Sequence, residues 1–289
     1  MDTIDFTPRR DFFVGIDSDG CAFDTMELKH KNVFIPQAIQ AFGFEAIADR
    51  YRSVAERVNL YSKTRGSNRF EAIAHCLDTL RDAEPLAVDI PDPQPIWEYV
   101  QSGRPLSNDS FAEYVQEIQD DLPVDQLDVV MRALNWSASS NRAIAELDVV
   151  VPPFPLVRES LEEAKTFANT MIVSATPAEA LRKEWGQAGL LSSIDVIAGQ
   201  EVGPKKQQIA AALQGGFAPE RALLIGDAPG DHRAAQDNGI LFFPIVPGKE
   251  KESWQQFHNE GLRNFRQERF AGAYQEHVVE VYYAALDAD

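Results

Sequence analysis

Five short apolar runs place the strongest constraint on this fold, and four of them lie close together in the second half of the chain. The runs are Phe12 to Ile16, Met171 to Ser174, Ile194 to Ala198, Ala222 to Ile225 and Leu241 to Ile245. Short continuous apolar runs of this kind predict buried strands. Helix-like segments that close on glycine separate the last four runs, for example KKQQIAAALQGG. This alternation predicts an α/β fold with a doubly wound, mostly parallel, Rossmann-like sheet.

The chain between the first and second runs has a different pattern. Segments such as AIADRYRSVAERVNLYS and VDQLDVVMRALNW carry apolar residues at helical spacing. At the end of this region VVPPFPLV contains three prolines, which prevent regular helix and favour an extended connection. We therefore predict an all-helical cap domain, residues 23–151, inserted into a core that consists of residues 1–22 and 152–289.

Charge and hydropathy exclude several classes of partner. The formal net charge is -18, and the acidic residues are spread along the chain, which disfavours binding to a nucleic acid. No run of 18 apolar residues occurs, and the first residues lack the pattern of a signal peptide. The only cysteines, Cys21 and Cys76, do not form a CxxC pair. We expect a soluble cytoplasmic protein with no membrane partner, no disulfide framework and no structural zinc.

Polar residues gather where the predicted strands end. In an open parallel sheet, ligands bind beyond the carboxyl ends of the strands, where the strand order reverses. The polar residues near these ends, or at the predicted helix start before the fourth run, are Asp17, Asp19, Ser174, Thr176, Lys205, Lys206, Asp227 and Asp231. Carboxylates packed this closely repel one another unless a hard cation offsets their charge, and Mg²⁺ suits such an oxygen-lined site. An aspartate beside that ion can attack phosphorus and form an aspartyl-phosphate.

Two local patterns support an anion site. Thr176, Pro177 and Glu179 have the form of a capping box with proline at the first helical position, which predicts a helix start just after Ser174. The free amides of that start would face a phosphate. Lys205 also lies at a predicted helix start, where a cation is unfavourable, so an anionic group is expected to face it.

This arrangement resembles the haloacid dehalogenase superfamily, whose four motifs occur here in order across the predicted core. The resemblance implies that Asp17 is the nucleophile and a magnesium ligand. It also implies that Asp19 binds the ion through its main-chain carbonyl. Asp19 would then protonate the departing oxygen and activate the hydrolytic water as general base.

The later motifs imply the remaining roles. By the resemblance, Ser174 hydrogen-bonds the phosphoryl group, and Lys205 neutralises that group and orients Asp17. Asp227 completes the metal shell, and Asp231 is a more distant or water-mediated ligand. The segment GPKKQQI lacks the KPxPD form that is frequent in the family, so Lys205 and Lys206 both stay open for the lysine role, with Lys205 preferred. We expect Thr176 and Lys206 to be substrate contacts.

A second cluster of polar residues lies in the predicted helical domain. The segment NLYSKTRGSNRFEAI places Arg65, Asn68 and Arg69 in a glycine-containing turn between two helices. Because caps in this superfamily supply substrate contacts, these residues are candidates for substrate binding. The alternative is a solvated helix junction with Ser67 as the N-cap.

The presence of Asp19 favours phosphate esters, because carbon–halogen cleavage in this superfamily needs no acid–base residue at that position. We therefore predict a magnesium-dependent phosphatase that acts on a small phosphorylated metabolite. A phosphomutase of the same superfamily, and a phosphate-binding or regulatory protein without turnover, stay open as alternatives. The sequence gives no prediction of the oligomeric state or of the substrate.

Overall fold

The computed structural model describes residues 8–83, 86–147 and 149–287 of the chain. Residues 1–7, on which part of the signal-peptide prediction rests, lie outside these ranges. The chain divides into two compact units, one of Met1–Met26 with Val149–Asp289 and one of Glu27–Asp148. We call them the core unit and the helical unit. Among the described residues, no helix is both long enough and apolar enough to cross a membrane.

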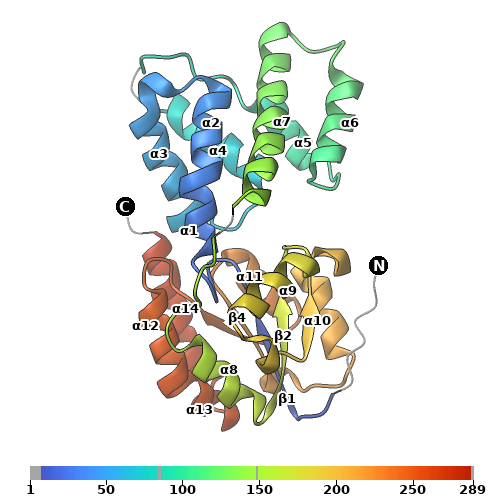
Figure 1. Cartoon of the computed structure of the whole chain (residues 1–289), viewed down its shortest axis with the longest axis vertical. Coiled ribbons are helices and arrows are strands. Elements are labelled where there is room, and N and C mark those ends of the chain that lie inside the picture. Colours follow the sequence, from blue (N-terminus) through green and yellow to red (C-terminus); the bar gives the residue numbers. More distant parts are fainter. Residues whose placement is uncertain (1–7, 84–85, 148, 288–289) are drawn as a thin grey trace. The chain divides into compact units, whose positions relative to one another are not determined.

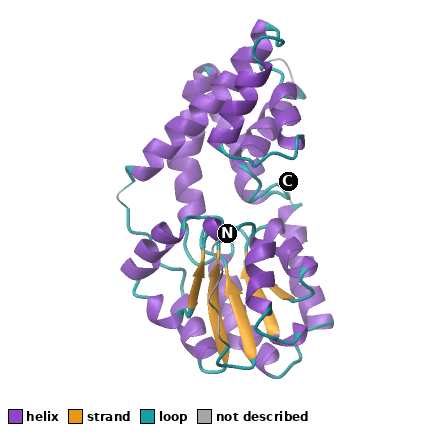
Figure 2. Ribbon diagram, turned by 90° about the vertical axis from the view of Figure 1, so that its right-hand side faces the viewer, coloured by secondary structure: helices purple, strands orange, loops and turns teal. Residues whose placement is uncertain are grey.

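A five-stranded parallel sheet in the order β3-β2-β1-β4-β5 forms the centre of the core unit (Figure 2). Its strands are β1 (Phe12–Ile16), β2 (Ala168–Val173), β3 (Val196–Ala198), β4 (Ala222–Gly226) and β5 (Leu241–Pro244). The order confirms the predicted doubly wound sheet, because the chain runs from β1 outward on one side and then crosses to the other. Each strand overlaps its predicted apolar run, and the bounds differ by a few residues at most.

Side chains of the strands alternate between two apolar layers, as the period of two in a strand requires. On one face, residues such as Val14 and Ile172 pack with α8, α9, α12 and α13, and on the other Phe13 and Met171 pack with α10 and α11, while α14 contributes residues to both layers. The helices are α8 (Val157–Lys165), α9 (Ala178–Gln187), α10 (Lys205–Leu213), α11 (Pro229–Asp237), α12 (Glu250–Gln256), α13 (Leu262–Arg266) and α14 (Ala273–Leu286). Both faces of the sheet are therefore covered by helices.

The helical unit has no strand among its described residues (Figure 1). Its helices are α2 (Ile35–Phe42), α3 (Ala48–Glu56), α4 (Arg69–Arg81), α5 (Gln94–Gln101), α6 (Asn108–Ile118) and α7 (Val124–Ala145), preceded by α1 (Thr25–Lys29). Phe70, Tyr99 and Phe111 form part of the unit's own core, and the ring centroid of Phe111 lies 4.5 Å from each of the other two. Aromatic rings of this size each bury a large apolar area, which stabilises the bundle.

One buried histidine of the core unit makes stability depend on pH. His232 of α11 stacks on Phe242, and its Nδ1 lies 2.9 Å from the Tyr283 hydroxyl. Burial, and then the charge of Arg233, hold the pKa of His232 below its usual value near 6.5. As the pH falls through 6.5, the unfolded chain takes up the proton first, so the folded state loses stability.

We expect His232→Asn to reduce the loss of unfolding free energy that accompanies acidification below about pH 6.5. Urea denaturation at several pH values measures this slope. His277→Asn is the matched control, because His277 is exposed on α14. If His232→Asn leaves the pH dependence of the unfolding free energy unchanged, His232 is not the source of that dependence.

Candidate active site

The carboxyl edge of the sheet brings the loops after β1 and β4 together. These strands are neighbours, with Ile16 in register with Ile225, and the Asp17 amide continues the ladder by donating to the Ile225 carbonyl at 3.0 Å. The strand order reverses between β1 and β4, which is the position where doubly wound sheets bind their ligands. Asp17 and Asp227 are the residues that follow the two strands.

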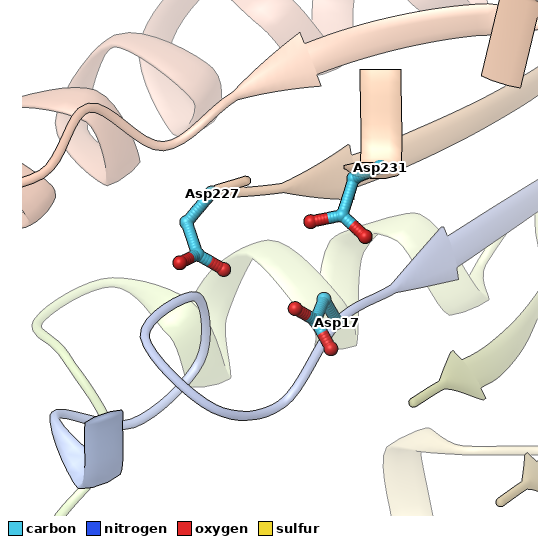
Figure 3. A group of neighbouring side chains, drawn as sticks. All are labelled: Asp17, Asp227 and Asp231. Carbon is cyan, nitrogen blue, oxygen red and sulfur yellow. The ribbon is translucent and has the colours of Figure 1, made fainter. Parts of the chain in front are cut away.

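Three buried carboxylates point toward one another at this position (Figure 3). They belong to Asp17 after β1, Asp227 after β4 and Asp231 in the first turn of α11, and each offers an oxygen within 4.8 Å of the others. Their residues are 5%, 1% and 0% exposed, respectively, so solvent screens their mutual repulsion poorly. Three residues that are separated by up to 214 positions thus form one acidic cluster.

A lysine lies against two of these carboxylates. The Nζ atom of Lys205, the first residue of α10, is 2.8 Å from Asp17 Oδ2 and 2.5 Å from Asp231 Oδ1. Lys206 instead pairs with the exposed Asp237 at 3.1 Å. Tertiary structure therefore distinguishes the two lysines, and Lys205 is the one that faces the anionic groups expected at this helix start.

The electrostatics of the cluster fit a hard divalent cation. Burial, opposed by the charge of Lys205 and reinforced by Asp231 and Asp227, raises the pKa of Asp17 well above its usual range. Lys205 offsets one of three formal negative charges, which leaves an excess that a cation would neutralise. All three donors are carboxylate oxygens, the ligand type that Mg²⁺ prefers. The donor set thus fits the predicted cofactor.

Gly226, the last residue of β4, allows Asp231 to approach the cluster. A β-carbon at Gly226 would lie 2.5 Å from Asp231 Cβ and 2.6 Å from its Oδ2. Asp231 cannot move away freely, because its Oδ2 accepts the Ala228 amide and its Oδ1 contacts Lys205. Glycine is thus required here by close packing and not by a turn.

We expect Gly226→Ala to cost about 1–3 kcal/mol of stability through overpacking and to lower activity about 100-fold by displacing Asp231. Gly230→Ala is the control in the same loop, because its β-carbon would have no contact closer than 4.0 Å, to Arg233. Urea denaturation and phosphate release measure the two effects. Equal activity of the two variants would show that the position of Asp231 is unimportant.

Asp19 lies two residues beyond Asp17 and is held by hydroxyl groups. Thr25 Oγ1 donates to its Oδ1, and Thr176 Oγ1 donates to its Oδ2 at 2.9 Å. Asp19 is half-buried, whereas Asp17 is buried. The contact of Thr25 with Asp19 was not predicted, and the only sequence signal for it is a hydroxyl residue near the first motif.

Ser174 directly follows β2 and is buried. Its amide donates to the Ala198 carbonyl, and its Oγ accepts the Thr176 amide at 3.1 Å. Gln208 of α10 holds the loop that follows β2, because its Nε2 lies 2.8–3.0 Å from the carbonyl oxygens of Ser174, Gly199 and Gly203. No sequence pattern indicated this role for Gln208.

The start of α9 differs from the predicted capping box. The helix begins at Ala178, and Thr176 does not cap it, because the Thr176 hydroxyl contacts Asp19 instead. The Ala178 amide donates at 3.2 Å to the carboxylate of Glu201, a residue of the short 3-10 turn Gln200–Val202. The predicted capping pair was therefore wrong, and a distant glutamate takes its place and occupies an amide that was expected to face phosphate.

A second polar group adjoins the cluster. The Ser18 hydroxyl, next to Asp17, donates to Glu184 at 3.0 Å and accepts from Trp185 Nε1 at 2.9 Å. Trp185 is fully buried and packs its ring against Phe23. Trp185 thus packs in the core and also holds the Ser18 hydroxyl beside Asp17.

The substrate-contact candidates of the predicted cap lie in the helical unit. Arg65 is buried and its Nη1 donates to the Leu60 carbonyl at 2.6 Å. Asn68, and not Ser67, is the N-cap of α4, since its Oδ1 accepts the Phe70 amide. Arg69 contacts Ser137 and Asn141 of α7. Substrate binding by these three residues stays a prediction.

Comparisons with known proteins give a match of fold. Neither the family models nor the curated proteins match this sequence. A solved structure provisionally named phosphoglycolate phosphatase, from Lactobacillus delbrueckii subsp. bulgaricus, is 13% identical, with TM-score 0.51, over 86% of this chain and 92% of that one. A haloacid dehalogenase-like hydrolase from Xanthomonas campestris is 11% identical, with TM-score 0.48, over 93% and 98% of the two chains. The chain has the haloacid dehalogenase-like fold, as the sequence resemblance implied.

Proposed function

We propose that the protein is a magnesium-dependent phosphohydrolase that acts on a small phosphorylated metabolite through an aspartyl-phosphate at Asp17. The proposal rests on the position of the Asp17 carboxylate at the switch point of the sheet, where it contacts Lys205 and offers an oxygen within 4.8 Å of the carboxylates of Asp227 and Asp231. The similarity of fold to a structure provisionally named phosphoglycolate phosphatase supports the same class of reaction.

Asp17, Asp227 and Asp231 would hold the magnesium ion. When bound, the ion would neutralise charge on the phosphoryl oxygens and on the cluster. Lys205 adds a second positive charge on the side of Asp17 Oδ2. The Ser18 amide donates to Asp17 Oδ1 at 2.8 Å, so the carboxylate is oriented through both oxygens. Such orientation before the substrate arrives lowers the entropic cost of attack.

The reaction proceeds in two displacements at phosphorus. A carboxylate oxygen of Asp17 forms a bond to phosphorus while the ester oxygen leaves, and Asp19 gives that oxygen its proton. Asp19 then takes a proton from water, whose oxygen attacks phosphorus and displaces the Asp17 carboxylate. Asp19 suits this exchange because hydroxyl groups of Thr25 and Thr176 hold it, and it is more exposed than Asp17.

The test is release of inorganic phosphate from a panel of small phosphate monoesters, with Mg²⁺ and with a chelator. We expect hydrolysis that requires Mg²⁺. Exchange of phosphoryl groups between sugar phosphates without net release would indicate a mutase instead. Binding of phosphate esters without any turnover across the panel would contradict the proposal and favour a binding protein.

A further inference from the structure

A buried tyrosine of α14 reaches the loop that carries two of the proposed metal ligands. Tyr282 is fully buried, and its hydroxyl donates at 3.0 Å to the carbonyl oxygen of Asp227, which lies 55 positions earlier in the chain. The helix packs against β5, which pairs with β4, and this places it beside the loop that follows β4. The last helix of the described chain thus contacts the candidate active site through the Tyr282 hydroxyl.

The peptide group between Asp227 and Ala228 is held from both sides. Its carbonyl oxygen accepts the Tyr282 hydroxyl, and its N–H donates at 3.1 Å to Oδ2 of Asp231. A hydrogen bond to the carbonyl polarises the peptide group and so strengthens the bond that its N–H makes. Tyr282 is therefore linked through one peptide group to the backbone of Asp227 and to the carboxylate of Asp231.

The preceding peptide group, between Gly226 and Asp227, is fixed by the sheet. The Gly226 carbonyl accepts the Ile245 amide at 2.8 Å, which extends the pairing of β4 with β5. Because peptide groups are planar, fixing the two that flank a residue sets its backbone angles and the direction of its Cα–Cβ bond. The sheet supplies one of these constraints on Asp227, and a side chain, that of Tyr282, contributes to the other.

We infer that Tyr282 is a positioning residue of the metal site, which holds the carboxylates of Asp227 and Asp231 in the geometry that a divalent cation requires. This role rests on the proposed function, in which these two residues bind Mg²⁺. Mg²⁺ demands near-ideal octahedral geometry, so displacement of its ligands weakens binding. Removal of a group that supports metal ligands without touching the ion commonly lowers metal affinity about 10- to 100-fold.

The test compares metal affinity in tyrosine-to-phenylalanine variants of the full chain. Mn²⁺ prefers the same octahedral oxygen ligands as Mg²⁺, so it is titrated without substrate while EPR measures the free ion, and competition then gives the affinity for Mg²⁺. Tyr282→Phe keeps the buried ring and removes only the hydroxyl, so the fold should survive. We expect this variant to bind both ions about tenfold more weakly than wild type.

Tyr283→Phe is the matched control, because it removes a hydrogen bond of similar length from the same helix. The Tyr283 hydroxyl lies 2.9 Å from Nδ1 of His232 on α11. Urea denaturation should show similar losses of stability in the two variants. Tyr283→Phe should nevertheless change metal affinity less than about twofold, since its hydroxyl does not hold the 227–228 peptide group. Tyr274→Phe should alter neither property, because the Tyr274 hydroxyl has no hydrogen-bond partner among the described residues.

Three results would overturn the role of Tyr282. Unchanged metal affinity in Tyr282→Phe would show that its hydroxyl does not position the ligands. Equal weakening by Tyr282→Phe and Tyr283→Phe would assign the effect to the packing of α14. Absence of Mn²⁺ binding to wild type would remove the metal site itself, and with it the metal dependence of the proposed function. Because no turnover is measured, a phosphate-ester panel without hydrolysis leaves the result for Tyr282 unaffected.

Discussion

Asp17→Asn is expected to lower turnover by a factor on the order of 10⁴ or more, because an amide oxygen cannot take the place of the attacking carboxylate. The fold should survive, since the amide has the same shape and the backbone contacts of Asp17 remain. The measurement is phosphate release at saturating Mg²⁺, corrected for the folded fraction. Asp237→Asn makes the same chemical change at an exposed position paired with Lys206 and should retain full activity.

The same substitution should raise stability at neutral pH when no metal is present. Burial raises the pKa of Asp17 above its value in the unfolded chain, so ionised Asp17 disfavours the folded state. Protonated Asp17 therefore stabilises the folded state. This contribution is complete below the pKa of Asp17 in the unfolded chain and is lost as the pH rises through the higher pKa of Asp17 in the folded protein. Asparagine removes this loss, so the advantage of Asp17→Asn over wild type should disappear on acidification. Residual metal-dependent turnover near the wild-type rate in this variant would contradict the nucleophile assignment.

Lys205→Met should be the most destabilising change in the site. It leaves Asp17 and Asp231 buried without the cation that contacts both, and breaking a buried pair costs about 3–5 kcal/mol. Lys206→Met is the matched control on the next residue, since its pair with Asp237 is exposed and should contribute at most about 1 kcal/mol. Urea denaturation in the presence of a chelator measures both variants.

Two conditions should reduce the loss in Lys205→Met. Lower pH lets the carboxylates take up protons, and Mg²⁺ supplies the missing positive charge, so each should bring the variant closer to wild type. Lys206→Met should respond to neither condition differently from wild type. Equal destabilisation by the two substitutions would show that Lys205 is not the cation that the cluster depends on.

The fold was predictable because its signal is local. An apolar run such as Phe12 to Ile16 is buried on both faces of a parallel sheet, so it reads as a strand without knowledge of its neighbours. Asp17 and Asp227 could be placed together because parallel strands end at one edge. The strand bounds shifted slightly, as for β2, because hydrogen bonding and not apolarity decides where a strand begins.

The rest of the site depended on contacts between distant segments. Glu201 caps α9 from 23 residues away, and Thr176, which looked like the cap, faces Asp19. The choice between Lys205 and Lys206 depended on how α10 is rotated against β2 and α11. Pairings of this kind follow from packing, and no spacing rule within one segment specifies them.

A phosphoryl group should become covalently attached to Asp17 during turnover. Asp19→Asn should slow the attack of water on this intermediate, because the general base is lost, so the intermediate should accumulate. Acid quenching after mixing with Mg²⁺ and an aryl phosphate, which needs little acid catalysis to leave, followed by borohydride reduction, converts an aspartyl-phosphate to homoserine. Mass spectrometry of the peptide that spans the first strand should find homoserine at position 17. Homoserine in place of another aspartate, or no homoserine while the aryl phosphate is still cleaved, would contradict an aspartyl-phosphate at Asp17.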